Sequence, residues 1–149
     1  MKEKTGPLPS QGQLQRTGVR FAGYAAVFGH PDSGGDVIRP GAFAASLEEL
    51  RDVPLLWQHK AGAVIGRVEH LSEDKRGLRV IAELGGGEEA RRAARLLETK
   101  KLDGLSFGYR VRQARRNDGL RELVELDLVE VSLVAEPMQP KARVHAVER

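Results

Sequence analysis

The sequence predicts an α+β fold in which strands dominate: an antiparallel β-barrel flanked by helices. Three observations support this expectation. Short runs rich in β-branched and aromatic residues recur along the chain, and two pairs of them are separated by short polar turns that are typical of hairpins. Only two segments have helical character. Because consecutive strands form hairpins and do not alternate with long helices, a closed or nearly closed antiparallel barrel fits better than a parallel α/β sheet.

The composition indicates one globular domain that neither spans a membrane nor binds nucleic acid. Of the 149 residues, 40% are hydrophobic and 30% are charged, as in folded proteins. No apolar run approaches the roughly 18 residues that span a bilayer, and the first residues carry no hydrophobic stretch, so no signal peptide is expected. The absence of cysteine excludes disulfides and a cysteine nucleophile and suits a reducing cytoplasm. The net charge of +3 is too balanced to indicate nucleic-acid binding.

The chain is expected to begin with a flexible arm and a strand. Residues 1–17 are poor in large apolar side chains, which predicts a flexible arm followed by one domain over 18–149. Residues 19–28 have the composition of a strand. Residues 30–36 are dominated by Pro, Asp, Ser and Gly and are expected to form a long turn.

A short helix, a strand and two hairpins account for the rest. Phe43, Leu47 and Leu50 recur at helical spacing, and the apolar run 55–59 follows as a strand. The remaining elements are a hairpin over 63–71 and 77–84, a helix over 88–101, a longer hairpin over 105–115 and 120–137, and a C-terminal tail of about a dozen residues without regular structure. The helix begins with acidic and ends with basic residues, as the helix dipole favours.

Two familiar motifs are discounted. Ser33 stands in Asp-Ser-Gly-Gly, but this composition near the start of the chain is that of a turn. Glycines 85–87 are not followed by Gly-Lys-Ser/Thr, so they predict no phosphate-binding loop. None of the four histidines has the i, i+4 spacing of a helical metal site, so we expect neither a metal ion nor another cofactor.

A histidine and a serine are the first candidates for catalysis. His59 ends the apolar strand, where a histidine can equally be a packed or surface residue. Ser106 alternates with large apolar residues in Leu-Ser-Phe-Gly-Tyr, so its side chain is expected on the open side of the strand. Gly108 shares that face and leaves room for the backbone of a substrate.

Glu130 interrupts the pattern of the last long strand. Val124, Leu126 and Leu128 form an apolar even-numbered face, and Glu130 falls on that same face. Either a bulge changes the phase near residues 128–129, or both faces are covered and Glu130 is partly buried. A buried carboxylate needs a partner, and a histidine is an obvious one. Nucleophile, base and orienting acid are then all available.

These residues lie in blocks that resemble the prohead (capsid maturation) proteases of HK97-type tailed phages. The similar blocks are FAGYAAVFGHPDSGGDVIRPGAF (21–43), PLLWQHKAGAVIGRVEHL (54–71), GLRVIAEL (77–84), LDGLSFGYRV (102–111) and LVEVSLVAEPMQPKARV (128–144). They follow the order of the family and cover roughly residues 19–144. That family is related in fold to the herpesvirus assembly proteases, which have a β-barrel surrounded by helices.

The resemblance assigns roles to particular residues. It implies that Ser106 is the nucleophile and His59 the general base of a serine endopeptidase. For the third member we choose Glu130, with Asp127 as the alternative and Ser132 more remote. By analogy with the arginine-bearing loop of the herpesvirus enzymes, Arg143 or a backbone N–H of residues 137–143 would stabilise the oxyanion. The chain is short for the family, which implies a compact member or a product of self-cleavage.

The resemblance also implies the partners and the place of action. The substrates would be a scaffold protein or the scaffolding segment of the major capsid protein, together with the protease itself, and self-association is expected. The site of action would be the inside of an assembling procapsid in the cytoplasm of a bacterial host. The alternative function is a catalytically inactive assembly factor that binds capsid or scaffold. It predicts that Ser106 or His59 is replaced, and because both are present the enzyme is favoured.

Overall fold

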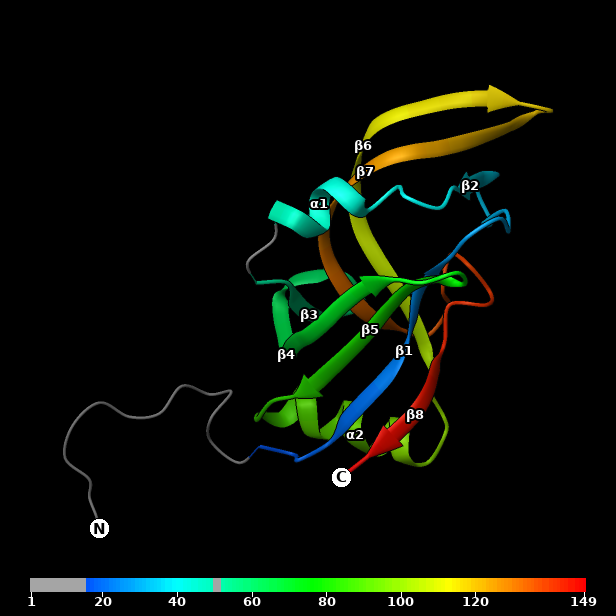
Figure 1. Cartoon of the computed structure of the whole chain (residues 1–149). Helices are drawn as coiled ribbons and strands as arrows, with labels where there is room; N and C mark the ends of the chain where they lie inside the picture. The colour runs from blue at the N-terminus through cyan, green and yellow to red at the C-terminus, as the bar shows by residue number, and fades with distance from the viewer. Residues whose placement is uncertain (1–15, 50–51) are drawn as a thin grey trace, which may run out of the picture.

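The computed structural model describes residues 16–49 and 52–149, and within them the chain forms eight strands and two helices, against the six or seven strands expected (Figure 1). In chain order these are β1 (Arg20–Val27), β2 (Asp36–Ile38), α1 (Ala44–Glu49), β3 (Pro54–Trp57), β4 (Lys60–Glu73), β5 (Gly77–Leu84), α2 (Glu88–Glu98), β6 (Gly104–Asn117), β7 (Leu120–Val134) and β8 (Val144–Glu148).

All eight strands belong to one sheet. The order is β2-β7-β3-β4-β5-β1-β8, and β6 also pairs with β7. The expected β-dominated fold with two helices is therefore confirmed. The expectation of purely antiparallel pairing is corrected, because β2 and β3 both run parallel to β7. These strands are far from β7 in the sequence, so no hairpin sets their relative direction.

The sheet curls like a barrel, but its ladder of strand pairs does not close. Between β6 and β1 the gap is spanned by the segment that precedes β8. Gly104 forms an isolated bridge with Arg143, and the N–H of Tyr24 donates to the carbonyl of Arg143 at 3.1 Å. A single bridged residue thus connects the two sides of the gap in place of a full strand ladder.

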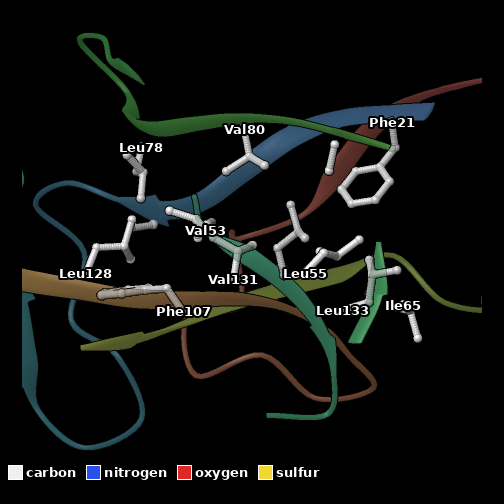
Figure 2. Packing of buried hydrophobic residues seen from close by; sticks show 14 of the residues in the cluster. Phe21, Val53, Leu55, Ile65, Leu78, Val80, Phe107, Leu128, Val131 and Leu133 are labelled. Carbon is white, nitrogen blue, oxygen red and sulfur yellow. The ribbon is translucent and has the colours of Figure 1, made fainter. Parts of the chain in front are cut away.

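The hydrophobic core fills the concave side of the sheet (Figure 2). Leu55 of β3, Val131 and Leu133 of β7, and Leu105 of β6 are all 0% exposed. Burial of each such side chain contributes about 1.5–3 kcal/mol. The strands that carry the catalytic candidates are therefore among the most firmly held in the molecule.

Both helices pack against the sheet, and α2 is shorter than expected. The start of α1 is held by Glu73 of β4, whose carboxylate accepts hydrogen bonds from the N–H groups of Gly41 and Phe43 at 2.9 and 2.8 Å. Leu50, expected in this helix, lies outside the described residues. α2 ends at Glu98, three residues before the expected boundary, because Lys100 adopts a left-handed conformation with φ 62°. Within the described ranges, no helix is long and apolar enough to cross a membrane.

Three further differences concern the ends of the chain and the first turn. The C-terminal residues do not form an irregular tail: β8 pairs antiparallel with β1 over Arg20–Gly23, a contact between the two ends of the chain that local composition does not reveal. β2 was missed because its three residues pair only with the distant β7. The predicted flexible arm lies almost wholly outside the described residues; of its last residues, Thr17 is buried and donates its N–H to Gly85.

Candidate active site

The candidate residues lie on three adjacent strands, with β7 in the middle. In register, Leu56 of β3 lies beside Ser132 of β7, and Ser132 lies opposite Ser106 of β6. Directly opposed residues in an antiparallel pair have Cβ atoms about 4.5–5.5 Å apart. The strand that leads into His59 and the strand that carries Ser106 are therefore separated by one strand only.

Ser106 is on the predicted face of β6, but this face is not open. The side chains of Leu105 and Phe107 enter the core, and Ser106 points the other way, yet the residue is only 4% exposed. Met138 and Gln139 line a small cavity together with Ser106. Within the described ranges the Ser106 hydroxyl makes no hydrogen bond. In the same ranges, every side-chain nitrogen or oxygen that is fully shielded from solvent has a hydrogen-bond partner. The Ser106 hydroxyl therefore has no hydrogen-bond partner among the described residues and keeps some contact with solvent.

Gly108 makes room for Glu130. The two residues are opposite one another in the β6–β7 register. A Cβ atom on residue 108 would lie 2.5 Å from Oε2 and 3.0 Å from Cδ of Glu130. Real Cβ atoms do not come within 3.0 Å of another heavy atom, so a side chain at this position would displace the carboxylate. The space above Gly108 is occupied by Glu130, which corrects the expectation that it lies open to a substrate backbone.

A bulge explains why Glu130 breaks the apolar pattern. Gly108 pairs with Glu130 and Tyr109 pairs with Leu128, so Val129 is an extra residue in β7. Leu126 and Leu128 face the core just before the bulge, and the odd-numbered Val131 and Leu133 do so after it. Val124, expected on the buried face with them, is not in the core, because a second shift in register places Leu123 there instead. Glu130 is moved to the face of Ser106, where it is nonetheless buried, with 8% exposed. Both alternatives left open by the sequence, the bulge and the burial, are therefore realised.

His59 was expected at the end of a strand, but it lies in the tight turn between β3 and β4. Gln58 and His59 have φ values of 53° and 62°, a left-handed conformation that costs about 1–2 kcal/mol per residue. Three hydrogen bonds to β7 and its end hold the turn: Gln58 N–H to Leu133 O at 3.0 Å, His59 N–H to Ser132 Oγ at 3.1 Å, and Ala135 N–H to Gln58 Oε1 at 3.2 Å. At about 0.5–1.5 kcal/mol each, these bonds offset the backbone strain.

The turn brings His59 onto Glu130. His59 Nδ1 lies 2.6 Å from Glu130 Oε2, and the hydroxyl of Ser132 donates to Glu130 Oε1 at 2.7 Å. Both carboxylate oxygens therefore have a partner, as a buried carboxylate requires. A carboxylate can only accept, so the ring proton resides on Nδ1. The other ring nitrogen, Nε2, makes no hydrogen bond within the described part of the chain and can act as a base.

The contact with Glu130 changes the pKa of His59. The hydrogen bond that His59 donates to Glu130 raises the pKa of His59 above its ordinary value of about 6.5; burial lowers this pKa, and the Coulomb attraction of Glu130 adds to the increase. About 40% of the His59 side chain is exposed, against 10% for Glu130. The acid is thus fixed inside the protein, and the imidazole extends from it toward solvent.

Asp127, the alternative acid, is outside this cluster. It lies before the bulge and forms an ion pair with Arg112, with Nε at 2.7 Å from Oδ1. The side chain of Arg112 is 50% exposed and that of Asp127 is 30% exposed. The structure therefore brings together His59, Glu130 and Ser132 opposite Ser106, and does not bring Asp127 to them.

The segment expected to stabilise an oxyanion lies beside the start of β6. The guanidinium of Arg143 donates to Asp103 Oδ1 at 2.8 Å and to Pro140 O at 2.9 Å, which fixes the side chain near Gly104. Buried Gln139 joins the segment to β1 through two bonds with Val27, at 2.8 and 2.9 Å. The segment is thereby tied to Asp103, just before β6, and to the end of β1, and its Met138 and Gln139 line a small cavity together with Ser106.

A small cavity of about 20 Å³ adjoins Ser106, and much of its lining is apolar. It is lined in part by Ile38, Leu105, Phe107 and Met138. Two larger cavities, of about 550 and 580 Å³, lie elsewhere, one beside the end of α2 and β8 and the other around Gly62 and Gly87, and neither is lined by His59, Ser106 or Glu130. Geometry and hydrogen bonding, not cavity size, therefore identify the candidate site.

The first turn has the structure expected of it. Asp32 Oδ1 accepts hydrogen bonds from the N–H groups of Gly34 and Asp36 at 2.8 and 2.9 Å. This Asx-type arrangement explains the Asp-Ser-Gly-Gly composition without a catalytic role for Ser33.

Sequence reasoning missed the bonding role of Ser132, which it considered only as a remote candidate for the acid. The hydroxyl contacts the backbone of His59 and the carboxylate of Glu130. The available signal was its position two residues after Glu130, and therefore on the same strand face. Its bond to His59 could not be found in that way, because it depends on the turn of a distant strand.

Comparison with known proteins extends these observations. Residues 8–149 match the family described as caudovirus prohead serine protease. The prohead protease of Enterobacteria phage HK97 is 38% identical over 96 residues, an alignment that covers 61% of this chain and 42% of the HK97 protein. The chain thus matches less than half of the length of that relative.

Solved structures with a similar fold come from herpesviruses. The protease of Kaposi's sarcoma herpesvirus in complex with a hexapeptide phosphonate inhibitor has a TM-score of 0.64 at 15% identity, covering 89% of this chain and 66% of the other. The varicella-zoster virus protease has a TM-score of 0.58 at 18% identity, covering 87% and 64%. At this identity the likeness concerns the fold alone, and it confirms the expected similarity in fold to herpesvirus proteases.

Proposed function

Because the chain belongs to the family of caudovirus prohead serine proteases, we propose that it is a serine endopeptidase of capsid maturation, with Ser106 as nucleophile, His59 as general base and Glu130 as orienting acid. One observation carries the assignment of residues. Buried Glu130 is bonded to Nδ1 of His59 and lies on the strand next to Ser106, on the same face.

The proposed reaction uses each group in turn. The hydroxyl of Ser106 attacks the carbonyl carbon of the scissile peptide bond, and Nε2 of His59 takes its proton. The negative charge of Glu130 stabilises the imidazolium that forms. His59 then gives the proton to the leaving amine as the C–N bond breaks, which leaves an ester on Ser106. A water molecule attacks this ester, Nε2 of His59 takes its proton, and the proton passes to Ser106 Oγ as the ester C–O bond breaks and the acid product leaves.

Contact between His59 and Ser106 would tighten in the complex with substrate. No hydrogen bond joins the two side chains in the described residues, and catalytic hydrogen bonds are often long or absent before substrate binds. Arg143 or a backbone N–H of residues 137–143 would stabilise the oxyanion, since this segment is held beside the start of β6.

The family supports a substrate class as well as a reaction. A prohead protease acts on proteins of the assembling capsid, so we assign as substrates a scaffold protein or the scaffolding segment of the major capsid protein, and the protease itself. The site of action would be the interior of the procapsid in a bacterial host. Self-association, expected from the resemblance, remains a prediction.

A fluorophosphonate probe tests the assignment directly. The probe labels an activated serine, so the wild-type chain should gain the mass of one adduct on the peptide that contains Ser106, and Ser106→Ala should gain none. Co-expression with the cognate capsid and scaffold proteins, followed by intact-mass measurement, should show cleaved products for the wild type only. Normal processing by Ser106→Ala would mean that another residue is the nucleophile.

The same experiment separates the enzyme from the alternative function. An inactive assembly factor would bind capsid or scaffold protein but would neither take up the probe nor cleave. The presence of both Ser106 and His59 and the bond between His59 and Glu130 favour the enzyme.

A further inference from the structure

Ser132 is a fully buried hydroxyl at the centre of the candidate site. It is 0% exposed, it lies opposite Ser106, and it contacts both members of the His59–Glu130 pair. We propose that Ser132 is a positioning residue, which fixes the direction of hydrogen bonding in this pair and holds the turn that carries His59. The inference deepens the proposed function, on which its catalytic consequence rests.

The first argument is the count of hydrogens. The N–H of His59 can only donate, so Ser132 Oγ accepts from it at 3.1 Å. The single hydroxyl proton of Ser132 is then directed to Glu130 Oε1 at 2.7 Å. No solvent reaches this side chain to offer another partner. The hydroxyl therefore has one arrangement available to it.

That arrangement determines the state of the histidine. With Oε1 engaged by Ser132, the second oxygen of Glu130 faces Nδ1 of His59 at 2.6 Å. The carboxylate, bonded through both oxygens, cannot rotate without losing a bond. It keeps the ring proton on Nδ1 and leaves the lone pair of Nε2 available, which is the tautomer a general base needs.

The second argument is the conformation of the turn. His59 has φ 62°, and its N–H is held to β7 by Ser132. The neighbouring Gln58 is held by Leu133 and Ala135. Without the hydroxyl, the bond that offsets the strain of the left-handed backbone at His59 is lost. We expect the turn to relax and Nδ1 to move away from Glu130.

The test begins with the His59 pKa, measured by NMR of labelled histidine side chains in Ser106→Ala, which avoids self-cleavage. Glu130 is the charged group that raises this pKa. In Ser132→Ala and in the shape-preserving Ser132→Cys, the pKa should fall toward its ordinary value. Ser132→Thr keeps a hydroxyl and should restore the value of the parent. His59→Gln identifies the resonance among those of the four histidines.

Ser46→Ala provides the matched control. Ser46 is also buried, at 4% exposed, and its Oγ accepts the N–H of Leu128 in β7 at 3.0 Å. Its loss removes a similar buried bond to β7 without touching His59 or Glu130. We expect a lower melting temperature and an unchanged His59 pKa.

Kinetics of the active chain complete the test. Ser132→Ala should lower kcat about ten- to hundredfold, as expected for loss of a hydrogen bond to a charged group, with KM changed by less than about threefold. A His59 pKa in Ser132→Ala equal to or above that of the parent would overturn the proposal, whatever the loss of activity. If the wild-type chain does not cleave protein, the proposed function fails, and the NMR titration still decides whether Ser132 positions the pair.

Discussion

The two halves of the β6–β7 hairpin both carry acidic side chains, but one half is packed against the core and the other is largely exposed. The near half, Gly104–Gly108 with Glu130–Val134, packs its apolar face into the core and carries Ser106, Glu130 and Ser132 on the other. The far half, Arg110–Asn117 with Leu120–Asp127, projects from the body of the sheet (Figure 1), and the short β2 pairs with its β7 strand over Arg121–Leu123. All eight residues from Arg110 to Asn117 are exposed, so this half of β6 contributes nothing to the core.

The contrast is clearest for two acids three residues apart. Asp127 in the far half pairs with a half-exposed arginine, a type of surface contact that contributes little to stability. Glu130 in the near half is buried, fully hydrogen-bonded and raises the pKa of a histidine. The bulge at Val129 separates these two environments. Position relative to the bulge, not residue type, therefore decides which acid lies against His59.

The largest expected effect comes from removing His59, the histidine that contacts Glu130 of the near half. His59→Ala should lower the rate of single-turnover cleavage by about 10⁴-fold or more, because without a base the hydroxyl of Ser106 is a poor nucleophile. Residues that act as a unit are not additive, so His59→Ala combined with Ser106→Ala should lose little beyond either change alone. His70→Ala, which removes an exposed histidine bonded to Ser72 at 3.1 Å, is the control. Independent, multiplying losses would show that His59 does not act with Ser106.

Exchanging each acid for its amide compares the two halves directly. Glu130→Gln keeps the shape of the side chain and removes the charge that stabilises the imidazolium, so the rate should fall by about 10²–10⁴-fold. Asp127→Asn should leave the rate within a few-fold, since its partner is Arg112. Single-turnover cleavage of one peptide by both variants is the measurement. A severe defect in Asp127→Asn together with an active Glu130→Gln would reverse the assignment.

A smaller effect is expected from filling the space that Glu130 occupies. The new methyl group in Gly108→Ala would meet Glu130 Oε2 and displace it, and a misplaced catalytic group costs up to about 10²-fold in rate. Gly62→Ala, on β4, is the control, because a Cβ atom there has no neighbour within 4 Å. A crystal structure of Gly108→Ala with Glu130 still on His59, and with full activity, would contradict this explanation of the glycine.

The smallest expected change is a shift in pH dependence. His59 must be neutral to accept a proton, so kcat/KM should rise with pH through its pKa. Because Glu130 raises this pKa, the midpoint should lie above the ordinary value of about 6.5. In Glu130→Gln the midpoint should move to lower pH, and in Asp127→Asn it should stay in place. The measurement is kcat/KM from pH 5 to 9, and an upward shift in Glu130→Gln would show that the carboxylate does not act on His59.

The sequence was sufficient where local pattern and local chemistry act together. Alternating side chains placed Ser106 and Gly108 on one face, and the phase error at Glu130 pointed to a bulge or a buried acid. The two hairpins and the Asx turn were also predictable, because their hydrogen bonds join residues close in the sequence. The fold class and the candidates His59, Ser106 and Glu130 followed from such signals and from family resemblance.

Tertiary structure decided what depends on pairing between distant segments. The parallel placement of β3 beside β7 puts His59 on Glu130 and gives Ser132 its second partner. The left-handed turn at Gln58 and His59 has no glycine to reveal it, and exists because bonds to β7 offset its strain. Likewise, β8 pairs with β1 although more than a hundred residues separate them, so no local pattern could indicate this pairing. Side-chain alternation fixes the face a residue occupies within its own strand, but the neighbour of that strand is selected by the free energy of the whole packed sheet.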